Sequence, residues 1–195
     1  MIRILFLVTF SLFFSACISI TQEVSSYDTY SLNLDNKSAQ KFRIQESIEI
    51  IEPKSLGSLN TLNIVYKNPS LSQESYALSK WSDKPSKMLQ GMIIENLSNE
   101  YEFVKSPYIK AQTSYRVQGL ILDFKQVYED NKSYVSIKIN NYLENKVSRK
   151  TLFKQFSYKK ETRGKNARST VIDLNELSNL YVRDLNLWIK EELKK

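Results

Sequence analysis

Apolar residues first gather in a run over residues 4–14, which has two polar breaks. A run of about 11 residues is shorter than the roughly 20 that a helix needs to cross a bilayer. One cation, Arg3, precedes the run, and the small residues Ser15 and Ala16 follow it. This layout is typical of a secretory signal, and it predicts one over residues 1–16.

Beyond this run, apolar and polar residues alternate in several places, which predicts β-strands. The predicted strands are 42–50, 62–66, 76–81, 101–104, 115–129, 133–144 and 150–161. Asn68-Pro69-Ser70 suits a turn that pairs the second strand with the third. Turn-forming residues at 130–131 and 145–146 separate the last three strands, which predicts an antiparallel meander.

Two segments instead show the spacing of an amphipathic helix. The first opens at Pro85, a residue tolerated in the first helical turn, and carries apolar residues at helical spacing up to Leu97. The second spans 173–195, where Asp173 and Glu176 fit a capping box. We expect both apolar stripes to face the core.

Together these elements predict an α+β fold with a mainly antiparallel sheet and two principal helices packed on one face. The sequence has no internal repeat and no charge block long enough to mark a second domain. The expected organisation is a signal peptide over 1–16, a lipidated tether over 17–29 and a single domain over 30–195.

The composition argues against several kinds of chemistry. The 195 residues include one Cys and no His, so an internal disulfide is excluded and a metal site is not expected. The usual general base near neutral pH is also missing. There is no Gly-rich phosphate loop or nucleophile-elbow motif. Asp123 lies in an apolar run, and we expect it to be a paired or edge-exposed carboxylate. We therefore expect a non-enzymatic protein without a cofactor, and an enzyme using carboxylate or Lys chemistry stays open.

The tetrapeptide Phe14-Ser15-Ala16-Cys17 resembles a bacterial lipobox, with Phe where Leu is usual. The resemblance implies that diacylglycerol is attached to the Cys17 thiol and that Cys17 becomes the mature N-terminus, carrying acyl chains such as palmitate. Ile18 follows in place of Asp, which by the enterobacterial sorting rule favours the outer membrane, facing the periplasm. Inner-membrane anchoring stays open, as do an uncleaved signal anchor and an incidental Cys.

A further set of short matches follows in order along the chain. They comprise a Tyr-x-Leu strand, an Ile-Val-Tyr strand, and a Tyr and a Trp before a Pro that opens a helix. The residues that carry these matches are Tyr30, Leu32, Tyr66, Tyr76, Trp81 and Pro85. In this pattern the chain resembles the ABC-type transport auxiliary lipoproteins, companions of MCE-type lipid transport systems. Lys67 departs from the usual Arg. From the residues alone, we expect these positions to be structural.

The resemblance implies an accessory that partners an ABC or MCE-type transporter moving lipids or small hydrophobes across the envelope. It does not identify the cargo, the oligomeric state or the partner. The alternative is a structural or scaffold lipoprotein for another envelope machine or the cell wall. Attachment to peptidoglycan through Lys195 belongs to that alternative, although helix capping also explains the final lysines.

The net charge of +7 is most concentrated over residues 149–168. The basic residues of this segment are Arg149, Lys150, Lys154, Lys159, Lys160, Arg163, Lys165 and Arg168. We expect the segment to end a strand and to form the loop into the last helix. It is either a solvated loop or a contact with an anionic surface, such as lipid head groups or an acidic partner. Nucleic acid is not expected for an exported protein.

Overall fold

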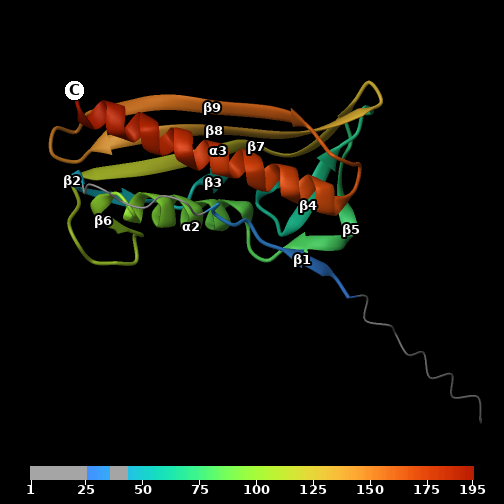
Figure 1. Cartoon of the computed structure of the whole chain (residues 1–195), viewed down its shortest axis with the longest axis horizontal. Helices are drawn as coiled ribbons and strands as arrows, with labels where there is room; N and C mark the ends of the chain where they lie inside the picture. Colours follow the sequence, from blue (N-terminus) through green and yellow to red (C-terminus); the bar gives the residue numbers. More distant parts are fainter. Residues whose placement is uncertain (1–25, 36–43) are drawn as a thin grey trace, which may run out of the picture.

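The structure, a computed structural model, describes residues 26–35 and 44–195. In this part of the chain, nine strands form one mixed sheet and two long helices cover it (Figure 1). The elements are β1 (Asp28–Tyr30), β2 (Ile44–Ile50), β3 (Lys54–Ser55), a 3-10 turn (Gly57–Leu59), β4 (Asn63–Lys67), β5 (Gln73–Trp81), α2 (Pro85–Ser98), β6 (Tyr101–Lys105), β7 (Tyr115–Glu129), β8 (Lys132–Asn145), β9 (Thr151–Glu161) and α3 (Ala167–Leu193).

The predicted meander is confirmed. β7 pairs with β8 along its whole length, β8 pairs with β9, and both pairings are antiparallel. Asp130 and Asn131 form the first turn with φ of 48° and 62°, the left-handed values that a two-residue hairpin turn requires. The connection between β8 and β9 is longer than a two-residue turn. It is closed by a hydrogen bond from the Asn145 N–H to the Lys150 carbonyl at 2.9 Å.

The other edge of β7 carries short strands one after another. β2, β3 and β4 each pair with it in parallel. Farther from β7, β6 pairs in parallel with β2, and β1 pairs in parallel with β5. The β4–β5 hairpin forms as predicted. The α+β prediction is therefore confirmed, with a sheet that is mixed: its longest pairings are antiparallel and most of its short ones are parallel.

The last helix begins earlier than the sequence predicted. α3 starts at Ala167, and the Oδ1 atom of its N-cap Asn166 accepts a hydrogen bond from the Ser169 N–H at 2.9 Å. The prediction of a capping box at Asp173 was wrong. Asp173 lies inside the helix, fully buried, and binds Lys160 Nζ at 2.6 Å. A satisfied cap at Asn166 extends the helix by two turns.

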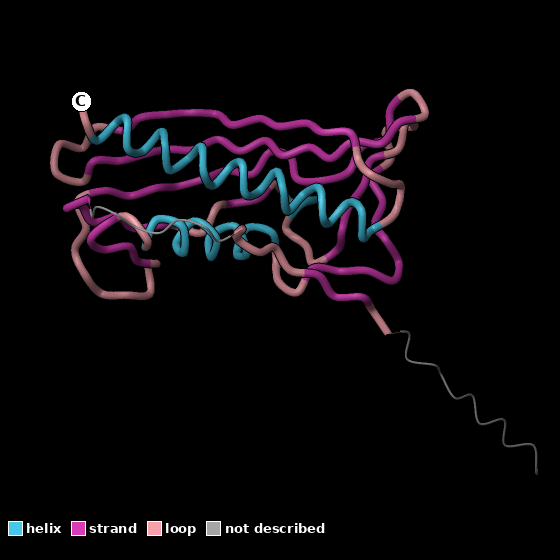
Figure 2. The backbone as a smooth tube through the Cα atoms, in the orientation of Figure 1, coloured by secondary structure: helices cyan, strands magenta, loops and turns pink. Residues whose placement is uncertain are grey.

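Both helices lie on the same face of the sheet (Figure 2). Between them and the strands is one apolar core, in which the Trp81 ring lies 5.9 Å from Phe124 and the Phe156 ring lies 5.7 Å from Tyr181. The Tyr181 hydroxyl donates to Asn141 Oδ1 at 2.8 Å. In the described part of the chain, no helix covers the opposite face of β7, β8 and β9.

Candidate functional site

Cys17, the predicted lipidation residue, lies outside the described residues. The described chain nearest to it is the segment 26–35, which we call the arm. β1 begins at Asp28, within the segment expected to be tether. The position of the arm therefore decides how an anchor at Cys17 would hold the domain.

The first half of the arm is part of the sheet. Tyr30 pairs with Trp81 of β5, and the Ser82 N–H donates to the Tyr30 carbonyl at 2.7 Å. The Leu32 side chain that follows is buried in the core. The arm is therefore fixed to the domain from Asp28 onward.

The second half of the arm is bound by two Asn side chains of α3. The Asn33 N–H donates to Asn175 Oδ1 and the Asp35 N–H to Asn179 Oδ1, both at 2.7 Å. Asn179 Nδ2 donates in return to the Asn33 carbonyl at 2.9 Å. Residues four apart share one face of a helix. The two side-chain amides therefore satisfy the backbone groups of the arm that a neighbouring strand would otherwise bond.

Replacing Asn179 with Ala is expected to free the end of the arm. The substitution removes two hydrogen bonds to the arm backbone, each of which contributes about 1 kcal/mol. Hydrogen exchange at the Asp35 amide should accelerate about tenfold or more. Asn60→Ala, which changes an exposed Asn far from the arm in sequence, is the control. Unchanged exchange at Asp35 would show that Asn179 does not hold the arm.

The residues that carry the family resemblance are packed into the domain. Tyr66 lies 5.1 Å from the Tyr76 ring and 5.8 Å from the Tyr128 ring. The Tyr76 hydroxyl donates to Gln126, and burial raises the pKa of Tyr128. Tyr30 and Leu32 belong to the arm, Trp81 to the core and Pro85 to the first turn of α2. These contacts tie the β4–β5 hairpin and the arm to the sheet.

The basic segment 149–168 is largely a strand, β9, and acids from other elements neutralise several of its cations. Lys159 pairs with Glu129 of β7. Lys160 and Arg163 both pair with Asp173 and Glu176 of α3, and the hydrogen bond from Lys160 helps to lower the pKa of Glu176.

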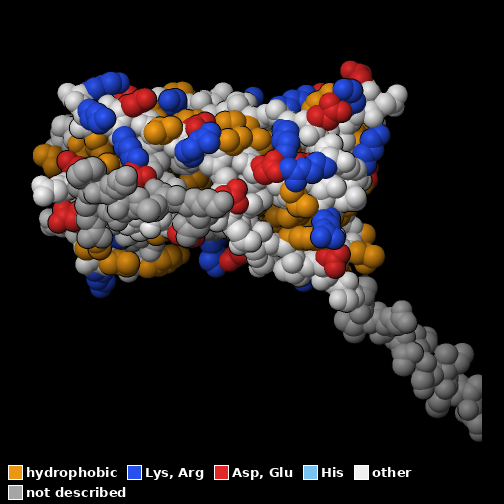
Figure 3. Space-filling view, viewed as in Figure 1, with side chains coloured by type: hydrophobic (Ala, Val, Ile, Leu, Met, Phe, Trp, Pro, Cys, Tyr) orange, Lys and Arg blue, Asp and Glu red, His pale blue; other side chains and the backbone are white. Residues whose placement is uncertain are grey.

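The other basic residues of the segment are spread along the molecule. Arg149 lies 3.8 Å from Glu144, and Lys154 lies over the Phe156 ring. Lys165 donates to the Asn131 carbonyl, Lys150 borders a hollow beside Glu192, and Arg168 is exposed on α3. Figure 3 shows blue and red side chains interspersed on the visible face. Acidic side chains thus lie beside Arg149, Lys159, Lys160 and Arg163. Contact of the segment with an anionic surface stays a prediction.

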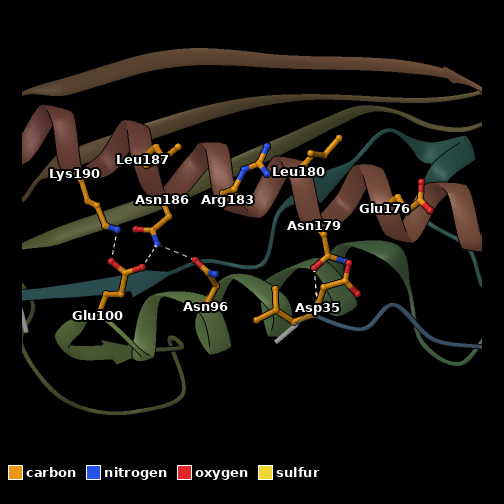
Figure 4. A pocket seen from close by; sticks show the side chains of 11 residues that line it. Asp35, Asn96, Glu100, Glu176, Asn179, Leu180, Arg183, Asn186, Leu187 and Lys190 are labelled. Carbon is orange, nitrogen blue, oxygen red and sulfur yellow. Dashed lines mark hydrogen bonds and ion pairs between the residues drawn. The ribbon is translucent and has the colours of Figure 1, made fainter. Parts of the chain in front are cut away.

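A hollow of about 590 Å³ lies between α2 and α3 (Figure 4). In it, Asn186 Nδ2 donates to Asn96 Oδ1 at 2.9 Å and to Glu100 Oε1 at 3.1 Å, and Lys190 pairs with Glu100. The arm enters the hollow at Asp35, and the Ile44 N–H donates to the Glu100 carbonyl at 2.8 Å. Asp35 of the arm and Glu100, which follows α2, therefore both line the hollow, and we assign no ligand to it.

One buried ionic cluster could not be predicted from the sequence. Glu49 and Lys105 are 6% and 4% exposed, and Lys105 Nζ lies 2.6 Å from Glu49 Oε1. Arg116 Nε lies 2.7 Å from the other carboxylate oxygen. Burial acts to raise the pKa of Glu49, but hydrogen bonds from both cations outweigh it and lower that pKa. The cluster joins β2, β6 and β7, and Lys105 also donates to the Ile109 carbonyl in the following loop.

The remaining acidic candidate, Asp123, is paired as expected, with its carboxylate 2.7 Å from Lys125 Nζ. Within residues 26–35 and 44–195, no group of three or more His, Cys, Asp and Glu side chains is placed to hold a metal ion. In the same ranges, no helix combines the length and the apolar character that crossing a bilayer requires.

No protein-family model matches the sequence, and no curated protein matches it. The crystal structure of XCC0632 from Xanthomonas campestris, assigned to the family model DUF330, superposes with a TM-score of 0.73 at 10% identity, covering 86% of this chain and 99% of that one. A crystal structure of an uncharacterized protein gives 0.67 at 12% identity, covering 84% and 99%. Identities this low show the fold alone, so the chain is similar in fold to the DUF330 protein XCC0632.

Proposed function

We propose that the protein is an envelope lipoprotein that serves as a non-enzymatic accessory of an ABC or MCE-type transport system. Diacylglycerol on Cys17 holds it at the outer membrane, and the domain works on the periplasmic side. The observation that carries the proposal is the lipobox-like sequence ending at Cys17, placed only a few residues before an arm that is built into the domain.

The fixed arm supports a short-range anchor. The ten links between Cys17 and Tyr27 span at most about 35 Å when fully extended. A domain fixed from Asp28 onward therefore stays close to the bilayer surface. Such tethering raises the effective concentration of the domain near a membrane partner, in the millimolar range for short linkers.

The accessory role rests on the family resemblance and on the fold. The six residues that carry the resemblance pack the hairpin, the arm and α2, so they support a shared domain and add no reaction chemistry. A protein of this kind contributes by docking on a partner, and the cargo would be handled by the substrate-binding component that it meets.

Crosslinking in cells tests the accessory role. The full chain, tagged at its C-terminus, is crosslinked, purified under denaturing conditions and identified with its partners by mass spectrometry. We expect a permease, ATPase or MCE-type component among them. Cys17→Ala, at matched expression, should reduce this capture at least about tenfold because tethering is lost. Capture of peptidoglycan alone, or of transporter components at an unchanged level in Cys17→Ala, would contradict the proposal.

A further inference from the structure

The face of the meander that carries no helix has an ordered set of outward side chains. Cα register places Gln118 of β7, Tyr142 of β8 and Phe153 of β9 in one row across three strands. The rows on either side are Leu120–Asn140–Gln155 and Arg116–Glu144–Thr151. We call these nine residues the outer platform.

Two aromatic rings form the centre of the outer platform. Phe153 is 57% exposed and Tyr142 is 38% exposed, whereas Leu143 and Phe156, on the opposite face of the same two strands, are buried. The ring centroids lie 5.4 Å apart with the planes tilted by 46°. The pair therefore presents aromatic surface to solvent next to the buried core.

Amide, hydroxyl and carboxylate groups surround the rings. A shallow hollow of about 230 Å³ is lined by Gln118, Tyr142, Glu144 and Thr151. On the other side, Gln155 Nε2 donates to Asn140 Oδ1 at 2.7 Å. The rings are thus bordered on both sides by groups that donate and accept hydrogen bonds.

The platform carries little net charge. Arg116 Nη1 lies 3.3 Å from Glu144, and Arg116 also binds Glu49. An acyl chain would need a deeper apolar groove, and a polyanion would need several cations facing outward. Exposed aromatic rings beside neutral amides suit a ligand with apolar C–H faces and many hydroxyl or amide groups. Pyranose rings have this combination.

We propose that the outer platform binds a glycan chain, with sugar rings stacked on Tyr142 and Phe153 and hydrogen-bonded to Gln118, Thr151 and the Asn140–Gln155 pair. The platform lies on the face of the sheet opposite the helices, whereas the second half of the arm is bound to α3. The inference does not depend on the transporter role. The occupant is a chain of N-acetylated amino sugars, as in the glycan strand of peptidoglycan, because its acetamido groups match the amide side chains of Gln118, Asn140 and Gln155.

Titration calorimetry tests the proposal with the full lipidated chain in a detergent that has no sugar head group. The probes are an N-acetylglucosamine hexamer, for the amino-sugar backbone of peptidoglycan, and cellohexaose, for a neutral polysaccharide. We expect the N-acetylglucosamine hexamer to bind more tightly than cellohexaose. Tyr142→Ala and Phe153→Ala should each weaken that binding about five- to tenfold.

Two control variants separate loss of stacking from loss of fold. Phe153→Tyr keeps an exposed ring and should bind within about twofold of the original. Tyr108→Ala removes an aromatic side chain that is 87% exposed elsewhere, and should bind unchanged. Thermal unfolding checks each variant. The proposal is overturned if the N-acetylglucosamine hexamer does not bind at millimolar concentration or binds no more tightly than cellohexaose. It is also overturned if folded Tyr142→Ala and Phe153→Ala variants bind as tightly as the original.

Discussion

Glu49→Gln is expected to lower the free energy of unfolding by about 3 kcal/mol at pH 7, measured by urea denaturation of the purified chain. The substitution keeps the shape of the side chain but removes the charge that faces Lys105 and Arg116. Lys105 is only 4% exposed, so its ammonium group would stay buried without a counter-ion. Leaving one member of a buried pair unmatched is among the most destabilising single changes.

The pH dependence gives this prediction a second readout. The pKa of Glu49 is below its ordinary value of 4.5 in the folded state. Its contribution to stability is therefore fully present above about pH 4.5 and is lost as pH falls through the folded-state pKa. The protonated Glu49 side chain and the glutamine that replaces it in the variant are nearly isosteric, and both are neutral. The difference in unfolding free energy between the two proteins should therefore shrink on acidification.

Glu102→Gln is the matched control, because Glu102 is an exposed carboxylate on β6, the same strand as Lys105. We expect it to change the unfolding free energy by less than about 0.5 kcal/mol. A Glu49→Gln difference that stays constant between pH 7 and pH 3, or a loss no larger than that of the control, would show that the buried pair has no such role.

Local patterns in the sequence predicted most of the elements. The meander, the β4–β5 hairpin and the start of α2 follow from alternation, turn residues and a Pro, all of which act within a few residues. The start of α3 was missed because two capping signals compete there. Asn166 caps the helix, and the acidic residue at 173 is used instead to bind Lys160 and Arg163.

Pairings between distant parts of the chain could not be predicted in this way. Lys105 and Arg116 lie 56 and 67 residues from Glu49, and nothing near Glu49 in the sequence marks it as buried in an ion pair. The parallel pairing of β2, β3 and β4 with β7 depends on the paths of their connections. Periodicity detects a strand but does not specify its neighbour.

In the candidate site too, local features could be predicted from the sequence and contacts between distant residues could not. The lipobox resemblance is a local motif and is visible in four residues. The binding of the arm depends on Asn175 and Asn179, which lie 142 and 144 residues beyond their partners. The only sequence signal for it was a pair of Asn residues four apart on one face of the last helix.

Loss of lipid at residue 17 is the other change with a large expected effect. Several acyl chains hold a protein stably on a bilayer, whereas weaker contacts do not. Cys17→Ala should therefore abolish carbonate-resistant association with membranes. The domain should unfold at the original temperature, because its described elements begin at Asp28. Ser19→Ala leaves the lipobox-like residues intact, and this control should remain with the membranes.

The most direct test of lipid anchoring through Cys17 is the mass of the N-terminal tryptic peptide of the protein purified from membranes. Lipid anchoring predicts a peptide that begins at Cys17, ends at Lys37 and carries the mass of a diacylglyceryl group with its acyl chains. The corresponding Cys17→Ala peptide should carry no such mass, and that protein should be washed from membranes by carbonate. An unmodified Cys17 peptide, or a Cys17→Ala protein that resists the wash, would contradict anchoring through this residue.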